Sequence, residues 1–175
     1  MKIIEALKKI KDLNRKADDI RSKISQNCAD LDAETPAYGT VEAQSKQIAE
    51  WLQAHSDLVK EIERLRLCIQ KTNLAVEVTV EVEDGKYVTK SIAAWIHRRK
   101  DLAATEMAAW RGLTSRALTP KNYKPDPLKD EVKIANIRKY YDQKNRDRMV
   151  EIYTSEPSRI DGSLEITNAT TDLIQ

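Results

Sequence analysis

The spacing of apolar residues predicts two long helices in the first 72 residues. From Lys2 to about Ala29, the pattern repeats at alternating intervals of four and three, which is typical of helices that pack on a partner helix. A second stripe of this kind runs from Val41 to about Thr72. The predicted inward positions are Ile3, Leu7, Ile10, Asn14, Ala17, Arg21, Ile24 and Cys28, flanked by Leu13 and Ile20, and then Val41, Gln44, Ile48, Trp51, His55, Leu58, Ile62, Leu65 and Ile69.

A short loop connects the two stripes and predicts that the helices run antiparallel. Residues 30–40 contain Pro36 and Gly39, which favour a turn, so residues 1–73 should form a helical hairpin. Polar residues interrupt the first stripe. Arg21 either helps to fix the register or carries its charged head out to water, whereas a seam histidine such as His55 is usually a hydrogen-bonded core residue.

Residues 74–90 change to a period of two, which predicts a β-hairpin. Valines alternate with polar residues, and Asp84-Gly85 is a strong signal for a type I′ turn, in which both residues have positive φ. A two-stranded hairpin is marginal in water, so its valine face needs a cover. We expect an assembly surface, although packing on the chain's own helices is the alternative. Its residues are Val76, Val78, Val80, Val82 and Tyr87.

The second half of the chain predicts two more helices. Ser91 is a plausible N-cap for a third helix that spans 91–118, with Ile92, Trp95, Ile96, Leu102, Ala103, Met107, Trp110 and Leu113 near one face. Residues 119–175 begin with a proline-containing linker and continue as a helix from about Pro127 to Ile152. Pro157 should end or kink that helix, and the tail could be a short helix or a strand. The predicted fold is mainly α, a single self-assembling structural unit with one inserted β-hairpin.

The composition favours exposed helices over a compact globule. The chain has no Phe, only four Gly, and 33% charged residues, which suits narrow apolar seams. Its N-terminal stretch lacks an apolar run long enough for a signal peptide or a membrane span. Cys28 and Cys68 should lie at opposite ends of the helical hairpin, as free thiols. These features predict a cytoplasmic protein, or a virion component, with no membrane partner.

The charge balance directs attention to local clusters. Lys and Arg number 30 against 28 Asp and Glu, so the net charge of +2 argues against nucleic acid as a partner. Arginines beside indoles can hold a phosphate and stack a base, and this pattern lies in the third helix. The candidate site for an anionic small molecule is Trp95, Arg98, Arg99, Trp110 and Arg111. The alternative is a solvated charged face with tryptophans in the core.

No catalytic motif, metal-ligand spacing or cofactor fingerprint is found in the sequence, so we expect a protein that is not an enzyme. Two functions remain open. The first is a homo-oligomer that captures a nucleotide-like signal of host defence. The second is a virion or scaffold protein that acts through its helix and hairpin interfaces.

Several short motifs resemble one family. They are Met1–Leu7 at the start, Ile69–Asn73, Asp84-Gly85 followed by Val88-Thr89 and the helix from Ile92, and then Ile160-Asp161, Asn168 and Thr171–Leu173. In this order they are similar to the uncharacterised DIP-type family of bacterial and phage proteins, some members of which are labelled septicolysin. The departures are a longer valine-rich hairpin and the Pro157 and Gly162 interruption. The resemblance implies a helical bundle of unknown activity with a phage or prophage origin, and it supplies no catalytic residues.

Overall fold

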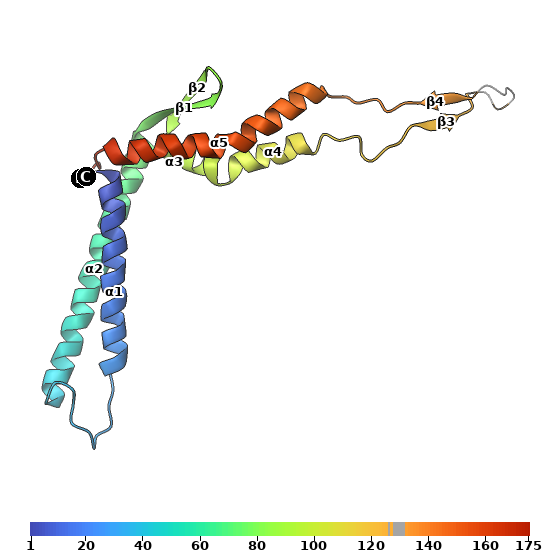
Figure 1. Ribbon diagram of the computed structural model, residues 1–175. Helices are drawn as coiled ribbons and strands as arrows, with labels where there is room; N and C mark the ends of the chain where they lie inside the picture. The colour runs from blue at the N-terminus through green and yellow to red at the C-terminus, as the bar shows by residue number, and fades with distance from the viewer. Residues whose placement is uncertain (126, 128–131) are drawn as a thin grey trace. The chain divides into compact units, whose positions relative to one another are not determined.

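The computed structural model describes residues 1–125, 127 and 132–175, and it confirms a mainly α fold (Figure 1). Contacts divide the chain into two compact units. The first comprises residues 1–78, 91–93 and 164–175, and the second comprises 79–90 and 94–163. In chain order the elements are α1 (Ile3–Asn27), α2 (Val41–Ala75), β1 (Glu77–Glu83), β2 (Lys86–Ser91), α3 (Ile92–His97), the π-helix η1 (Arg98–Leu102), α4 (Ala103–Arg111), β3 (Lys121–Tyr123), β4 (Lys133–Ala135) and α5 (Gln143–Thr170).

The first unit contains the predicted antiparallel hairpin of α1 and α2, which lie side by side in Figure 1. Helix α2 begins at the predicted residue because the Thr40 hydroxyl accepts the N–H of Ala43 at 3.1 Å. Its inner stripe holds from Gln44 to Ile69, whereas Val41 is exposed. The core between the helices is formed by Leu13, Ile62 and Leu65, with Ile10 and Leu58 against it.

The predicted seam of α1 is wrong at three of its eight positions. Leu7, Arg21 and Cys28 are exposed, whereas the flanking Leu13 is buried and Ile20 is half-buried. The sequence of α1 contains two alternative stripes of three-four spacing. Both include Ile3, Ile10, Ala17 and Ile24, and they differ at the positions between these residues. The helix turns Leu13 and Ile20 inward because burying apolar groups is favourable, whereas burying Arg21 would cost the hydration of its charge.

The two ends of the chain meet in the first unit. The N–H of Ile3 donates to the carbonyl of Thr171 at 3.1 Å, and the N–H of Leu173 donates to the carbonyl of Met1 at 2.9 Å. One residue further on, the N–H of Ile174 donates to the Thr72 hydroxyl at 2.9 Å. Residues 171–174 are therefore fixed to both helices of the hairpin.

The β-hairpin lies where the alternation predicts, but its turn differs from the prediction. Gly85 has a φ of +76°, whereas Asp84 is outside the left-handed region, so the turn is not type I′. The left-handed conformation costs energy for a residue with a Cβ, and Glu81 holds the turn by accepting the N–H of Gly85 at 2.8 Å. Across the strands, the hydroxyls of Thr79 and Thr89 hydrogen-bond at 2.7 Å.

The third helix begins at Ile92 as predicted but ends at Arg111 rather than Leu118. Arg116 and Ala117 adopt left-handed φ values of 55° and 54°, which an α-helix cannot accommodate. Within the helix, η1 is a widened turn in which the N–H of Ala103 bonds the carbonyl of Arg98. The predicted inward residues Ile96 and Leu102 are exposed, whereas Trp95 and Ala103 on either side of the widened turn are buried.

The predicted helix from Pro127 to Ile152 is wrong in its first part. Positions 126 and 128–131 lie outside the described residues, and Lys133–Ala135 forms β4, which pairs antiparallel with β3. In this register Lys121 is opposite Ala135, and Tyr123 is opposite Lys133. The prolines on either side of β3 restrict the backbone to extended conformations, which favours strand pairing over a helix.

Helix α5 runs unbroken through Pro157 and Gly162, where the sequence predicted an interruption. Pro157 removes the N–H that would bond the carbonyl of Tyr153, and α5 is bent along its length in Figure 1. The helix persists because Glu156, Ile160 and Leu164 on either side of these residues are buried. Tertiary packing therefore outweighs the local cost of the proline and the glycine.

Candidate functional site

The second unit contains a cavity of about 220 Å³ between the β-hairpin and the helices that follow. Its apolar wall includes Val82, Val88 and Ile152, and the fully buried Trp95 forms part of the lining. The complete lining is Val82, Glu83, Lys86, Val88, Lys90, Trp95, Arg98, Arg148, Met149, Ile152, Tyr153 and Glu156. The cavity thus combines an aromatic and aliphatic interior with charged side chains.

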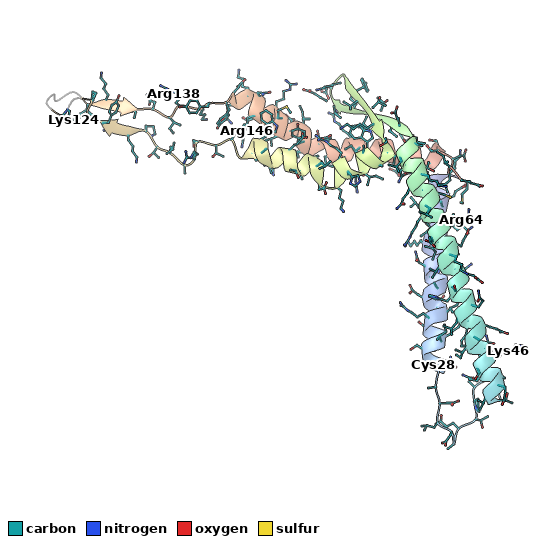
Figure 2. The ribbon with its side chains drawn as sticks, turned by 180° about the vertical axis from the view of Figure 1, so that it is seen from behind. Cys28, Lys46, Arg64, Lys124, Arg138 and Arg146 are labelled. Carbon is teal, nitrogen blue, oxygen red and sulfur yellow. The ribbon has the colours of Figure 1, made fainter. Side chains whose placement is uncertain are left out.

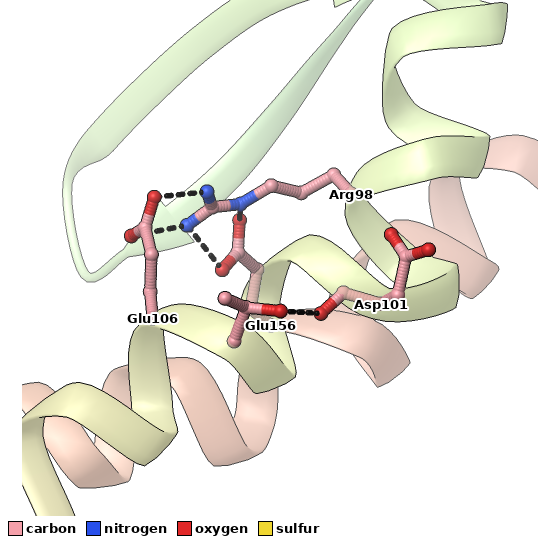
Figure 3. A network of polar contacts seen from close by, with 5 residues as sticks. Arg98, Asp101, Glu106 and Glu156 are labelled. Carbon is pink, nitrogen blue, oxygen red and sulfur yellow. Dashed lines mark hydrogen bonds and ion pairs between the residues drawn. The ribbon is translucent and has the colours of Figure 1, made fainter.

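Arg98 lies at the centre of a polar network at one side of this cavity (Figure 3). Its Nε and Nη2 donate to the Glu156 carboxylate at 2.7 and 3.0 Å, and its Nη1 and Nη2 donate to Glu106 at 2.7 and 3.0 Å. The guanidinium also lies 5.3 Å from the centroid of the Tyr153 ring. Because Glu156 is 3% exposed and the Arg98 side chain 14% exposed, this ion pair is largely shielded from water.

Arg98 and Glu106 keep their charges over the physiological range. The hydrogen bonds from Arg98, and then that from Tyr153, lower the pKa of Glu106 to about 2. Hydrogen bonds to the Glu106 carboxylate, and then to that of Glu156, raise the pKa of Arg98. Burial raises the pKa of Tyr153, and its hydrogen bond to Glu106 adds to that shift. Arg98 therefore remains a cation whose charge its own neighbours already compensate.

Where the cavity adjoins the β-hairpin, its lining carries more positive than negative charge. Of the described residues that line it, four are cationic and two are anionic. Arg148 is paired with Glu83, its Nε lying 2.7 Å from the carboxylate. Lys90 holds its Nζ 5.1 Å from the Trp95 ring centroid and also lowers the pKa of Glu106, and Lys86 is exposed. Strand β2 therefore supplies the two cations that are least neutralised.

The structure brings together two of the five predicted ligand residues. Trp95 and Arg98 line the cavity, whereas Arg99, Trp110 and Arg111 do not. Arg99 pairs with Asp161 on an exposed surface, Trp110 is half-buried, and Arg111 is exposed.

The cavity residues Lys86, Lys90 and Tyr153 were not predicted from the sequence. The alternation of the hairpin was the available signal for Lys86, Val88 and Lys90, because residues two apart on a strand share a face. No local pattern connects Tyr153 or Glu156 to Arg98, since more than 50 positions separate them in the sequence.

The predicted assembly residues differ in their accessibility. Val78 and Val80 are buried within the chain, and Val76 and Val82 are half-buried. Tyr87, in contrast, is 64% exposed. The valine face is thus covered by the chain itself, and the role of the hairpin in assembly stays a prediction.

The part of the chain that the structure describes offers no candidate metal site and contains two free thiols. It contains no cluster of three His, Cys, Asp or Glu side chains that could hold a metal ion. Cys28 is an exposed free thiol and Cys68 a buried one. Across the same described residues, every helix is too short or too polar to span a bilayer.

Comparisons with known proteins support the fold. No family model and no curated protein matches the chain. A conserved protein of unknown function from Corynebacterium diphtheriae, solved by crystallography, is structurally similar with a TM-score of 0.55. The alignment covers 99% of each chain at 18% sequence identity. At this identity the likeness shows a shared fold and carries no residue roles.

Proposed function

We propose that the protein is a non-enzymatic binding protein that captures a small anionic molecule in the cavity beside the β-hairpin. The observation that carries this proposal is the excess of cations, Lys86 and Lys90, over an apolar and aromatic interior that contains Trp95. Ligand sites commonly combine such an apolar wall with a few polar groups that orient the ligand.

The cavity restricts the class of ligand. A volume of about 220 Å³ suits a molecule near or below the low end of the drug-sized range. The ligand should have a flat or apolar part that contacts Trp95 and Ile152. Its anionic group should face Lys86 and Lys90. Nucleotide-like signals of host defence have this chemistry, so we propose that the protein sequesters such a signal, as part of a homo-oligomer.

The family and the origin of the protein are proposals as well. We also propose membership of the DIP-type family, which short motifs of the sequence resemble, and a phage origin, which would suit a protein that removes a defence signal. The experiment below tests the binding and does not depend on that origin.

Substitution of both cavity lysines should abolish capture. In the variant K86E/K90E we expect the affinity for nucleoside monophosphates to fall at least tenfold, because two attractive charges become repulsive. Isothermal titration calorimetry with AMP and GMP, and native mass spectrometry of gently purified protein, would measure the binding and any retained adduct.

The matched control is Arg111→Glu, which changes a cation of the originally predicted site that does not line the cavity. It should bind like the unmodified protein. Loss of binding in Arg111→Glu, with binding retained in K86E/K90E, would instead place the ligand on the α4 surface. Absence of both binding and a retained adduct in the unmodified protein would contradict the proposal.

A second candidate function is structural, and the surface of α2 favours it. Five exposed apolar side chains lie within an arc of about 80° at 100° per residue, on a different side of the helix from its inner stripe. They are Val41, Leu52, Val59, Leu67 and Leu74. A stripe of this length on a 35-residue helix is suited to pairing with another helix, as in a virion or scaffold protein.

A further inference from the structure

The segments that flank and include β3 and β4 carry cations without acids. Across residues 112–125 and 132–141, the sequence contains six Lys or Arg and no Asp or Glu. The cations are Arg116, Lys121, Lys124, Lys133, Arg138 and Lys139, and the nearest acids between the strands fall at positions 126, 130 and 131. Figure 2 shows Lys124 and Arg138 along this extended part of the second unit. A net charge of +2 for the whole chain therefore conceals a basic segment.

Aromatic side chains alternate with these cations. Tyr140 is 89% exposed and Tyr123 is 47% exposed. In the β3–β4 ribbon, Tyr123 is opposite Lys133, and Lys121 lies two residues away on the same strand, so all three side chains share one face. The ribbon therefore presents an aromatic ring beside two cations on one face.

Two adjoining grooves follow the segment. One is lined by Tyr123, Ile134, Asn136 and Arg138, and the other by Arg116, Arg138, Lys139, Tyr140 and Tyr141 among others. Ile137 and Arg138 line both grooves, so the two grooves adjoin at these residues. Among the residues that the structure describes, no acid lines either groove.

We propose that this segment binds single-stranded nucleic acid. The backbone phosphates would contact Arg116, Lys121 and Arg138, while unpaired bases would stack on Tyr123 and Tyr140. Lys124 and Lys133 take part in other interactions, and Lys139 donates to Gln143 at 3.0 Å, so the proposed contacts do not depend on these three.

Single strands fit this surface better than duplexes or membranes. Stacking needs bases whose faces are accessible, which a single strand offers and a duplex buries. A membrane-binding surface would need a broad apolar face next to its cations, whereas here polar Asn122 and Asn136 stand among the apolar residues. The proposal concerns a different part of the second unit from the cavity beside the β-hairpin.

The test is fluorescence anisotropy with labelled oligo(dT) and oligo(U) of about 20 nucleotides, and a duplex of matched length. For three phosphate contacts, the affinity should fall roughly 20-fold between 50 and 200 mM salt. Arg138→Ala should reduce that salt dependence by about one contact, and Tyr140→Ala should weaken binding at least fivefold, because it removes a stacked base. Both residues are exposed, so circular dichroism should show unchanged folding.

The matched control is Arg66→Ala, an exposed arginine of the first unit, which should bind like the unmodified protein. The variant K86E/K90E should also retain strand binding, which separates this proposal from the small-molecule function. Equal binding of duplex and single strand with no effect of Tyr140→Ala would overturn the proposal in favour of general polyanion binding. Binding to anionic vesicles but not to oligonucleotides, or no binding at 50 mM salt, would overturn it as well.

Discussion

At the scale of single residues, Arg98 makes the network that most depends on exact side-chain placement. It joins α4 and α5 through Glu106 and Glu156, and its own side chain is only 14% exposed. Removal of one partner from a buried pair is costly because it leaves the other charge without compensation. Here Glu156, at 3% exposure, would be that charge.

Arg98→Ala should therefore destabilise the second unit strongly. We expect a loss of about 3–5 kcal/mol in the free energy of unfolding, measured by urea denaturation. The neighbouring Arg99→Ala is the control, because the Arg99–Asp161 pair is about half exposed and should contribute no more than about 1 kcal/mol. Equal losses in the two variants would mean that the Arg98 network is not a special support of the fold.

The same network should make stability depend on acidity. The pKa of Glu106 is lowered from its ordinary value of 4.5 to about 2, chiefly by Arg98. The folded state therefore binds this proton more weakly than the unfolded state, and the stabilisation is complete above about pH 4.5 and lost as the pH falls toward 2. In Glu106→Gln, the decline in stability between these pH values should be shallower, as urea titrations at each pH would show. An unchanged slope would contradict the shift.

Arg98 could be identified from the sequence as a candidate site residue, but its partners Glu106 and Glu156 could not. The cluster of cations beside Trp95 was visible in the chain, and both residues do line the cavity. Glu106 is eight positions further along the same helical run, and Glu156 is on another helix, so no spacing rule joins them to Arg98. The interpretation of Arg98 as an open ligand-binding cation did not include these intramolecular carboxylates.

At the scale of elements, periodic segments were predictable, whereas some of their ends were not. The inner stripe of α2 and the valine alternation of β1 appear where expected, since each buries one continuous face. The end of the third helix and the beginning of α5 were misplaced. Apolar residues such as Ile134 fit a helical face as well as a strand, and Pro157 is a strong local signal that burial on either side overrides.

The hydrogen bond that connects α2 to residues 171–174 should make a measurable contribution to the free energy of unfolding. Thr72 is fully buried, donates to the carbonyl of Cys68 at 2.8 Å and accepts the N–H of Ile174. Thr72→Val keeps the shape but leaves that N–H without its acceptor, so we expect a loss of about 1–3 kcal/mol and faster amide exchange at Ile174. Thr170→Val, at an exposed hydroxyl bonded within α5, should change stability little. Unchanged exchange at Ile174 would contradict this role.

At the scale of the whole molecule, averages concealed local features. The net charge of +2 argued against nucleic acid, yet it combines two acid-free segments, residues 112–125 and 132–141, with a more acidic remainder. The hydrophobic content likewise gave no indication that α2 carries two stripes, one against α1 and one exposed. Both features become visible when residues are placed on their elements.

The exposed stripe of α2 predicts an oligomer. In the variant L52S/L74S we expect a shift to monomers in analytical ultracentrifugation or native mass spectrometry, because two exposed apolar contacts are lost. Leu31→Ser, at an equally exposed leucine of the loop before α2, should leave the oligomer intact. Tyr87→Ser would test separately whether the hairpin contributes. A monomeric unmodified protein would contradict the structural function and the oligomeric part of the binding function.

The π-helix η1 has a consequence for how this helix tolerates changes in length. Trp95 and Ala103 are both buried although eight residues separate them, which would place them about 80° apart on a regular α-helix. Seven residues, by contrast, make almost two complete α-helical turns. A chain that lacked the exposed Lys100 could therefore form a continuous α-helix and still bury both residues. Related chains that differ by a one-residue deletion here should keep the same helix faces.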